Sequence, residues 1–247
     1  MFAKKYNDPR CGYYDFIHDF FSHNKSICNL DYKWLPAYIE TLNYFSFNKE
    51  ESNLIVNAPP GAGKSQFGTR IFSVFYALLT GKVIIVTQSI RTAKSIRQEI
   101  SNILESKFIR ETFGITKSSF VTNNVEGISL NVYDFEIIIM TTGSNITGLR
   151  GYLIIFDDAV NPTTFCSSIA EQNSTKAQIR QIFTRSFPDT KYLLIESRSS
   201  QKDLTSIFTK YWKEEGIKFI HFIIFYLPWY DESYENEIEP RFKHQSF

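Results

Sequence analysis

The sequence contains little cysteine and little histidine. Its three cysteines, Cys11, Cys28 and Cys166, are widely spaced in a chain of 247 residues. No pair of them has metal-ligand spacing, so they fit buried thiols in a reducing cytoplasm. The histidines are scattered over four positions, His18, His23, His221 and His244. A metal site formed by His18, His23 and Cys28 is one reading, but ordinary surface or core histidines explain the pattern better.

Long hydrophobic runs are also absent. The longest apolar stretch covers residues 219–229 and contains His221 and Pro228. It is too short to span a bilayer and favours a buried strand. Residues 1–8 become polar at once, so no signal peptide is expected. We therefore expect a cytoplasmic chain with no membrane partner.

Charge of one sign does not dominate either. The chain has 27 basic and 26 acidic residues, a net charge of +1, and 43% hydrophobic residues. This balance does not by itself indicate a nucleic-acid-binding protein, although a local basic patch would be sufficient for one. The length suits one large α/β domain or two small ones. No internal repeat or low-complexity segment is present.

The most informative segment covers residues 58–65 and reads Ala-Pro-Pro-Gly-Ala-Gly-Lys-Ser. It follows an apolar run at 53–57 and precedes a helical pattern. This context predicts a phosphate-binding loop of the Walker A type, in which Ala58 replaces the first glycine. The two prolines donate no hydrogen bond, so the donors must begin at Gly61. The alternative is a chance Gly-Lys-Ser in an ordinary loop.

This loop predicts ATP and Mg²⁺ as cofactors. Lys64 would reach the β- and γ-phosphates, and the Ser65 hydroxyl would face a magnesium ion that keeps most of its waters. Backbone N–H groups at the start of the following helix would complete the cradle. The predicted nucleotide-binding residues are Pro60, Gly61, Ala62, Gly63, Lys64, Ser65 and Gln66.

A second motif has the character of Walker B. The apolar run 153–156 ends in Asp157 and Asp158. In an ATPase, Asp157 would orient a water bound to the metal, and Asp158 would polarise the attacking water. A buried strand followed by an Asp-rich turn is the alternative interpretation.

A third motif, at 142–151, reads Thr-Gly-Ser-Asn-Ile-Thr-Gly-Leu-Arg-Gly. A glycine-rich loop at the strand tips can approach phosphate closely. Arg150 is therefore predicted to act as an arginine finger that neutralises charge on the γ-phosphoryl group. The alternative is a solvated loop arginine.

Hydrophobic periodicity predicts an α/β fold. Helical patterns cover 13–49, 66–80, 92–113, 163–187 and 204–215, with Gly81 as a helix stop. Apolar runs predict strands at 53–57, 82–87, 134–140, 152–156, 191–196 and 219–227, and a hairpin within 119–133. Continuous apolar strands that alternate with helices predict a mostly parallel sheet with helices on both faces. The ligand should then lie at the carboxyl ends of the strands.

Taken in order, these motifs resemble the ATPase domain of the large subunit of tailed-phage terminases. The resemblance covers about residues 30–245. It is carried by the Pro-Pro phosphate loop, by the Thr-Gly-Leu-Arg-Gly loop before the two aspartates, and by the segment 197–204, which is similar to a coupling motif. The ends of the ATPase domain are similar at 226–228 and 239–242.

The resemblance implies a P-loop NTPase of the additional-strand, catalytic-acid type that drives double-stranded DNA into a procapsid. Implied partners are a portal protein, a terminase small subunit and other copies of the chain in a ring, in the bacterial cytoplasm. Arg150 would then act in its own chain or on a neighbouring subunit's nucleotide.

The same resemblance divides the chain into a helical lead-in at 1–50, an ATPase domain at 51–230 and a tail at 231–247. A nuclease domain would be expected to begin in that tail, so nuclease activity is not expected here and a separately encoded nuclease is a further possible partner. Two other functions stay open. One is a different P-loop motor such as a helicase, and the other is a decayed prophage fragment or a nucleotide-binding assembly module.

Overall fold

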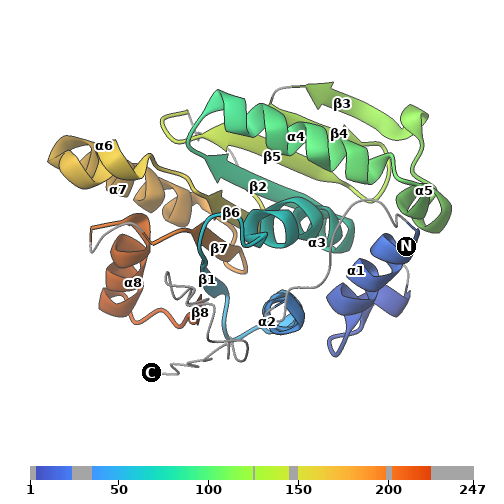
Figure 1. Cartoon of the computed structure of the whole chain (residues 1–247), viewed down its shortest axis with the longest axis horizontal. Helices are drawn as coiled ribbons and strands as arrows, with labels where there is room; N and C mark the ends of the chain where they lie inside the picture. Colours follow the sequence, from blue (N-terminus) through green and yellow to red (C-terminus); the bar gives the residue numbers. More distant parts are fainter. Residues whose placement is uncertain (1–3, 24–34, 125, 145–149, 199–201, 224–247) are drawn as a thin grey trace, which may run out of the picture.

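The computed structural model describes residues 4–23, 35–124, 126–144, 150–198 and 202–223. In this part of the chain an eight-stranded sheet has the order β3-β4-β5-β2-β6-β7-β1-β8 (Figure 1). The strands are β1 Asn53–Asn57, β2 Lys82–Thr87, β3 Phe120–Asn124, β4 Gly127–Leu130, β5 Glu136–Thr141, β6 Leu153–Asp157, β7 Lys191–Glu196 and β8 Ile220–Ile223. Neighbouring strands from β5 to β8 are parallel. The β3–β4 hairpin adds an antiparallel edge, so the predicted mostly parallel sheet is confirmed.

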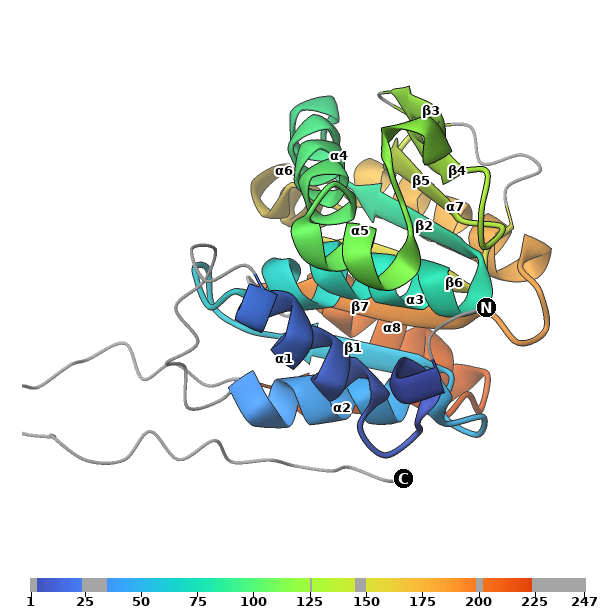
Figure 2. The same cartoon turned by 90° about the vertical axis from the view of Figure 1, so that its right-hand side faces the viewer.

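Helices cover both faces of this sheet (Figures 1 and 2). Side chains of β1 alternate between two hydrophobic clusters: Leu54 and Val56 join one, and Ile55 joins the other. The first cluster includes side chains of α1 Gly12–His23, α2 Leu35–Phe47, α3 Phe72–Thr80, α4 Ile90–Leu104 and α5 Lys107–Phe113. The second includes side chains of α6 Pro162–Ser167, α7 Ile169–Arg185 and α8 Leu204–Glu214.

The amino-terminal helices pack directly on the helix that follows the phosphate loop. The Tyr13 ring lies 5.0 Å from Phe72 and 5.0 Å from Phe75, centroid to centroid. Phe16 lies 5.4 Å from Phe75. Edge-to-face rings of this kind add to the area they bury. Helices α1 and α2 therefore share one core with the sheet.

Several predicted helices are interrupted by capping side chains. The pattern at 92–113 divides into α4 and α5, because the Ser106 hydroxyl accepts from the Ile109 N–H at 3.4 Å. The pattern at 163–187 divides at Ser168, which accepts from the Glu171 N–H at 3.2 Å. A hydroxyl that satisfies a first-turn N–H starts a new helix. The pattern at 13–49 likewise gives α1 and α2, while 24–34 and the predicted strand end at 224–227 lie outside the described residues.

The helix after the phosphate loop begins with an unusually wide turn. Residues Gln66–Ile71 form a π-helix, labelled η2, before α3 starts; such turns are rare and are frequent at functional sites. Short 3₁₀ turns, η1 Lys4–Asn7 and η3 Lys117–Ser119, complete the elements of the described chain. Gly81 ends α3 with φ 105°, as predicted.

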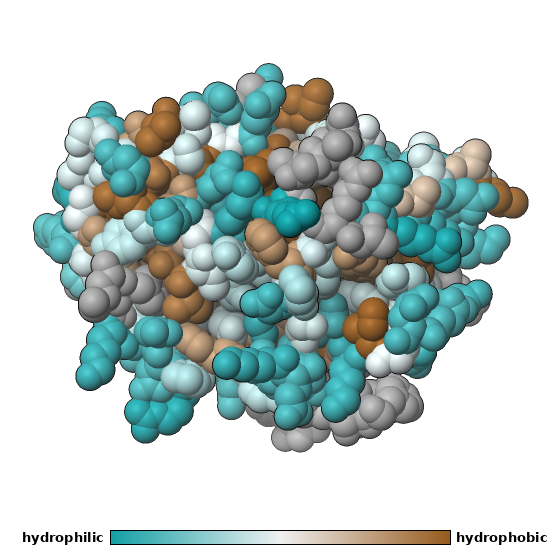
Figure 3. Space-filling view, turned by 180° about the vertical axis from the view of Figure 1, so that it is seen from behind, coloured by the Kyte–Doolittle hydropathy of each residue, from teal (hydrophilic) through white to brown (hydrophobic). Residues whose placement is uncertain are grey.

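Hydrophobic side chains on the surface are dispersed. On the face shown in Figure 3 they are interspersed with hydrophilic ones. The most exposed large ones include Ile169, Val121 and Ile90, which lie on three different elements. Within the described residues, no helix combines the length and apolarity needed to cross a bilayer.

Gly68 allows the closest approach between η2 and α2. A Cβ atom at this position would lie 2.0 Å from the Tyr38 hydroxyl oxygen and 2.6 Å from Ile195 Cδ1. The same Tyr38 hydroxyl donates to the Lys64 carbonyl at 2.9 Å. The missing side chain of Gly68 therefore makes room for the bond that holds the carboxyl end of the phosphate loop.

We expect Gly68→Ala to lower the free energy of unfolding by about 1–3 kcal/mol, the usual cost of overpacking a core. In a Tyr38→Phe background the nearest clashing atom is gone, so the same substitution should cost less. Urea denaturation of the wild type, both single variants and the double variant checks this. Equal costs of Gly68→Ala in the two backgrounds would contradict the contact.

Candidate nucleotide-binding site

The phosphate loop and the paired aspartates lie at one edge of the sheet. Strands β1 and β6 are parallel and are separated only by β7. The register pairs Asn57 of β1 with Glu196, and Asp157 of β6 with Ile195. Their carboxyl ends therefore meet at the same rim, as Figure 1 shows.

The loop conformation depends on two glycines. Gly61 has φ 79° and Gly63 has φ 75°, a region that glycine adopts without steric cost. Ala58 is buried, and its N–H donates to the Glu196 carbonyl at 3.3 Å. The alanine that replaces the first glycine thus continues the ladder between β1 and β7. Pro60 and Gly61 are exposed at the loop tip.

Two residues of the loop contact the two aspartates. The Ser65 hydroxyl donates to Asp157 Oδ1 at 2.7 Å, across 92 positions of sequence. Lys64 Nζ lies 3.3 Å from Asp158 Oδ2. The Lys64 side chain is only 7% exposed, so its ammonium is held within the site. The structure therefore brings four predicted site residues together.

The two aspartates have different environments. Asp157 is buried, and burial raises its pKa above the ordinary value, although the Ser65 hydrogen bond opposes that rise. Asp158 has φ 40°, an uncommon conformation for a residue with a side chain. Its N–H donates to the Ile195 carbonyl at 2.9 Å. Its Oδ1 atom accepts from the Ser197 N–H at 3.3 Å, so the strained turn aims Asp158 at the lysine.

Ser197 is a further contact of the lysine. Lys64 Nζ donates to Ser197 Oγ at 2.9 Å. Ser197 follows β7 directly and belongs to the predicted coupling segment. In that segment, Arg198 Nε donates to Asp203 Oδ2 at 2.7 Å, and Asp203 caps α8 by accepting from the Ser206 N–H at 3.0 Å. Residues 199–201 lie outside the described part of the chain.

Arg150 does not join this cluster within its own chain. It precedes β6, whose first residue, Leu153, pairs with Lys191 at the start of β7. The five residues of β6 span about 13 Å between the first and last Cα atoms, so Arg150 and Asp157 lie at opposite edges of the sheet. The Arg150 guanidinium carbon lies 5.8 Å from the centre of the Phe187 ring. Of the third motif, residues 145–149 lie outside the described residues.

A buried polar network behind the loop connects three strands with α8. His221 Nε2 lies 2.7 Å from Asn57 Oδ1, and Asn57 Nδ2 donates to Thr205 Oγ1 at 2.8 Å. Thr205 Oγ1 in turn donates to Glu196 Oε2 at 2.8 Å. Burial raises the pKa of Glu196 to about 7 and lowers the pKa of His221 to about 4.

Sequence reasoning missed most of this supporting shell. Asn57 and Glu196 are polar residues that end apolar strand patterns, and that position was the available signal for them. Tyr38 carries no such signal, because it is one of many apolar positions in a helical pattern. Its contact with Lys64 depends on tertiary packing alone.

The expected metal chemistry has two parts. Among the described residues, no group of three or more His, Cys, Asp or Glu side chains could hold a metal ion. His23 Nδ1 lies 2.8 Å from the Asp19 carbonyl oxygen, and Cys28 lies outside the described residues. Ser65 and Asp157 offer two hard oxygen atoms side by side, which suits Mg²⁺ that keeps several waters.

Comparison with known proteins gives matches only at the level of structure. No protein-family model matches the sequence. No curated protein matches it either. The structure is similar to the ATPase domain of the large terminase of Thermus phage P74-26, at 14% identity and a TM-score of 0.48, over 76% of this chain and 72% of that one. It is also similar to the large terminase of another thermophilic bacteriophage, at 10% identity and a TM-score of 0.41, over 74% of this chain and 44% of that one.

We expect Glu196 to make stability fall as pH rises. Its pKa is about 7 in the folded chain against 4.5 ordinarily, so its stabilising proton is fully held below pH 4.5 and is lost as pH rises through 7. The shift corresponds to about 3 kcal/mol of free energy of unfolding.

Urea denaturation of the wild type and of Glu196→Gln at pH 5 and pH 8 tests this. The wild type should lose about 3 kcal/mol more than the variant over this interval. The difference isolates Glu196, because His221 titrates in both proteins. Identical pH dependence in the two would rule out the buried acid.

Proposed function

We propose that this chain is an ATPase of the P-loop type, in its additional-strand, catalytic-acid class. The observation that carries the proposal is the contact between Ser65 and Asp157, which unites two motifs 92 positions apart. The strand order gives further support. Strand β7 is inserted between β1, which leads into the loop, and β6, which ends in the aspartates. An extra strand at that position gives the class its name.

The residues present fit a magnesium-bound nucleotide. Asp157 is a buried carboxylate whose pKa is raised by desolvation, and a cation beside it would remove that penalty. Gly61 and Gly63 let the backbone N–H groups converge on an anion. Bound Mg²⁺ would neutralise charge on the phosphate oxygens.

In this proposal each side chain has one task. Lys64 binds the β- and γ-phosphates, and Ser65 with Asp157 holds the ion. Asp158 orients the attacking water, for which its 44% exposure leaves access. The contact between Lys64 and Asp158 at 3.3 Å would give way as phosphate oxygens become partners of the lysine.

The biological task that we propose is the packaging of double-stranded DNA into a viral procapsid in the bacterial cytoplasm. Support for this comes from the order of the motifs, including the segment that begins at Ser197. A portal protein, a small subunit and a ring of copies are the corresponding partners. A helicase would instead separate the strands of forked DNA. A decayed module would bind ATP with hydrolysis near background.

We expect Lys64→Ala to reduce ATP turnover by at least about 10²-fold, because the transition-state charge loses its closest cation. Steady-state phosphate release, with and without double-stranded DNA, is the measurement. Lys176→Ala is the matched control, since Lys176 is exposed on α7, and it should keep the wild-type rate. ATPase activity at the wild-type level in Lys64→Ala would refute the proposal.

Arg150 lies at the far edge of the sheet, so any role as an arginine finger must involve another copy. We expect Arg150→Ala to lower turnover by about 10³-fold in the assembled state and to leave dilute chains unaffected. Turnover measured against protein concentration checks this. Mixing Arg150→Ala chains with Lys64→Ala chains should restore part of the rate, because each supplies what the other lacks. A loss of turnover that does not depend on concentration would contradict action between subunits.

A further inference from the structure

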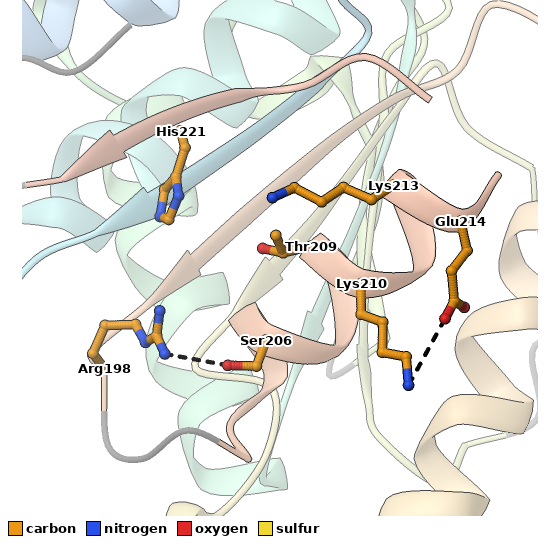
Figure 4. Close-up of a pocket in the computed structure, with 7 residues that line it drawn as sticks. All are labelled: Arg198, Ser206, Thr209, Lys210, Lys213, Glu214 and His221. Carbon is orange, nitrogen blue, oxygen red and sulfur yellow. Dashed lines mark hydrogen bonds and ion pairs between the residues drawn. The ribbon is translucent and has the colours of Figure 1, made fainter. Parts of the chain in front are cut away.

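A basic pocket lies beside α8, away from the magnesium-side aspartates. It has a volume of about 450 Å³ and opens between α8 and the strand end that carries His221. Figure 4 shows the side chains that line it: Arg198, Ser206, Thr209, Lys210, Lys213, Glu214 and His221. The sequence patterns did not single out this set, because its members come from a loop, a helix and a strand.

Positive charge exceeds negative charge in this lining. Lys210 lies 3.7 Å from Glu214, and in Figure 4 its side chain turns toward that carboxylate. Lys213 extends the other way, toward Thr209 and His221. Arg198 enters from the opposite side and donates to Ser206 Oγ at 3.2 Å. An ammonium and a guanidinium therefore flank a space that also contains two hydroxyls.

The charge of Arg198 is partly offset from behind. Its Nε atom bonds the buried carboxylate of Asp203 at 2.7 Å, which fixes the plane of the guanidinium, while its Nη2 atom faces Ser206 on the pocket side. His221 is neutral at physiological pH, because burial lowers its pKa to about 4. The positive charge of the pocket thus comes from Lys213 and Arg198.

These donors suit a phosphate group. Arginine, lysine and hydroxyl side chains supply most contacts to nucleic-acid backbones. None of the described lining residues is Phe, Tyr or Trp, so the pocket lacks the ring that usually stacks on a base. We propose that this pocket binds a backbone phosphate of double-stranded DNA without reading its sequence. The choice of DNA, as opposed to free phosphate, rests on the proposed function.

The pocket is distinct from the nucleotide site but begins at the next residue. Ser197 accepts from Lys64 Nζ at 2.9 Å, whereas Arg198 faces Ser206 on α8. A variant at Lys213 can therefore probe the pocket without touching a contact of Lys64. Lys213 is exposed, so its substitution should leave the fold intact.

The test measures binding of a fluorescent DNA duplex of arbitrary sequence to the full chain over a range of salt concentrations. We expect Lys213→Ala to weaken binding about fivefold near 0.15 M salt and to reduce the slope of log affinity against log salt by about 0.9, the value for one lost phosphate contact. Lys213→Arg should retain binding. Lys107→Ala, at an exposed lysine of α5, is the matched control and should behave as wild type.

A second arm separates the two sources of phosphate. A fluorescent ATP analogue and inorganic phosphate should bind wild type and Lys213→Ala equally. If they bind the variant more weakly while the duplex binds unchanged, the pocket takes free phosphate and the proposal is wrong. It is also wrong if the duplex binds wild type and Lys213→Ala alike, or does not bind wild type.

The proposed ATPase function fails separately from this pocket. Phosphate release by the wild type and by Lys64→Ala is measured in the same preparations. A wild type without turnover whose DNA binding depends on Lys213 would remove the motor and support the pocket. Normal turnover with DNA binding independent of Lys213 would do the reverse.

Discussion

The last two carbonyl groups of β7 hold both motifs in place. The Ile195 carbonyl accepts from the Asp158 N–H at 2.9 Å, and the Glu196 carbonyl accepts from the Ala58 N–H at 3.3 Å. One strand end thus fixes the first residue of the loop and the second aspartate. Because backbone hydrogen bonds of buried strands leave little freedom, the spacing between Lys64 and the two aspartates follows from the sheet. The supporting network behind Glu196 matters for the same reason, since it anchors this strand end to α8.

Charge at the rim shows what the arrangement is suited to hold. Lys64 is nearly buried and faces Asp158, so this pair is close to neutral. Asp157 has Ser65 as its hydrogen-bond donor, and a hydroxyl cannot neutralise a carboxylate. A buried carboxylate without full compensation is costly, and that cost is the reason for its raised pKa. A divalent cation that brings its own anionic ligand would satisfy both the aspartate and the lysine.

The sequence was most informative where a pattern is local. Strands such as 191–196 were predicted with their exact bounds, because an apolar run on a two-sided sheet is continuous. Helix breaks at Ser106 and Ser168 were missed, since a capping serine resembles any other polar residue within an amphipathic pattern. The position of Arg150 could not be read from the sequence either. A loop between two parallel strands must return from one edge of the sheet to the other, and a glycine-rich composition does not say at which edge a given residue stops.

Ser197 and Arg198 show how closely the two proposed sites are joined. Successive residues of extended backbone point to opposite sides, and here one side chain meets Lys64 while the next meets α8. Asp203 then ties Arg198 to the first turn of that helix. Any change in the partner of Lys64 therefore acts on a serine whose neighbour is ion-paired to the helix that carries Lys213. The connection is a single peptide unit followed by a charged hydrogen bond. Such a short path needs no rearrangement of the sheet to let the occupancy of one site alter the geometry of the other.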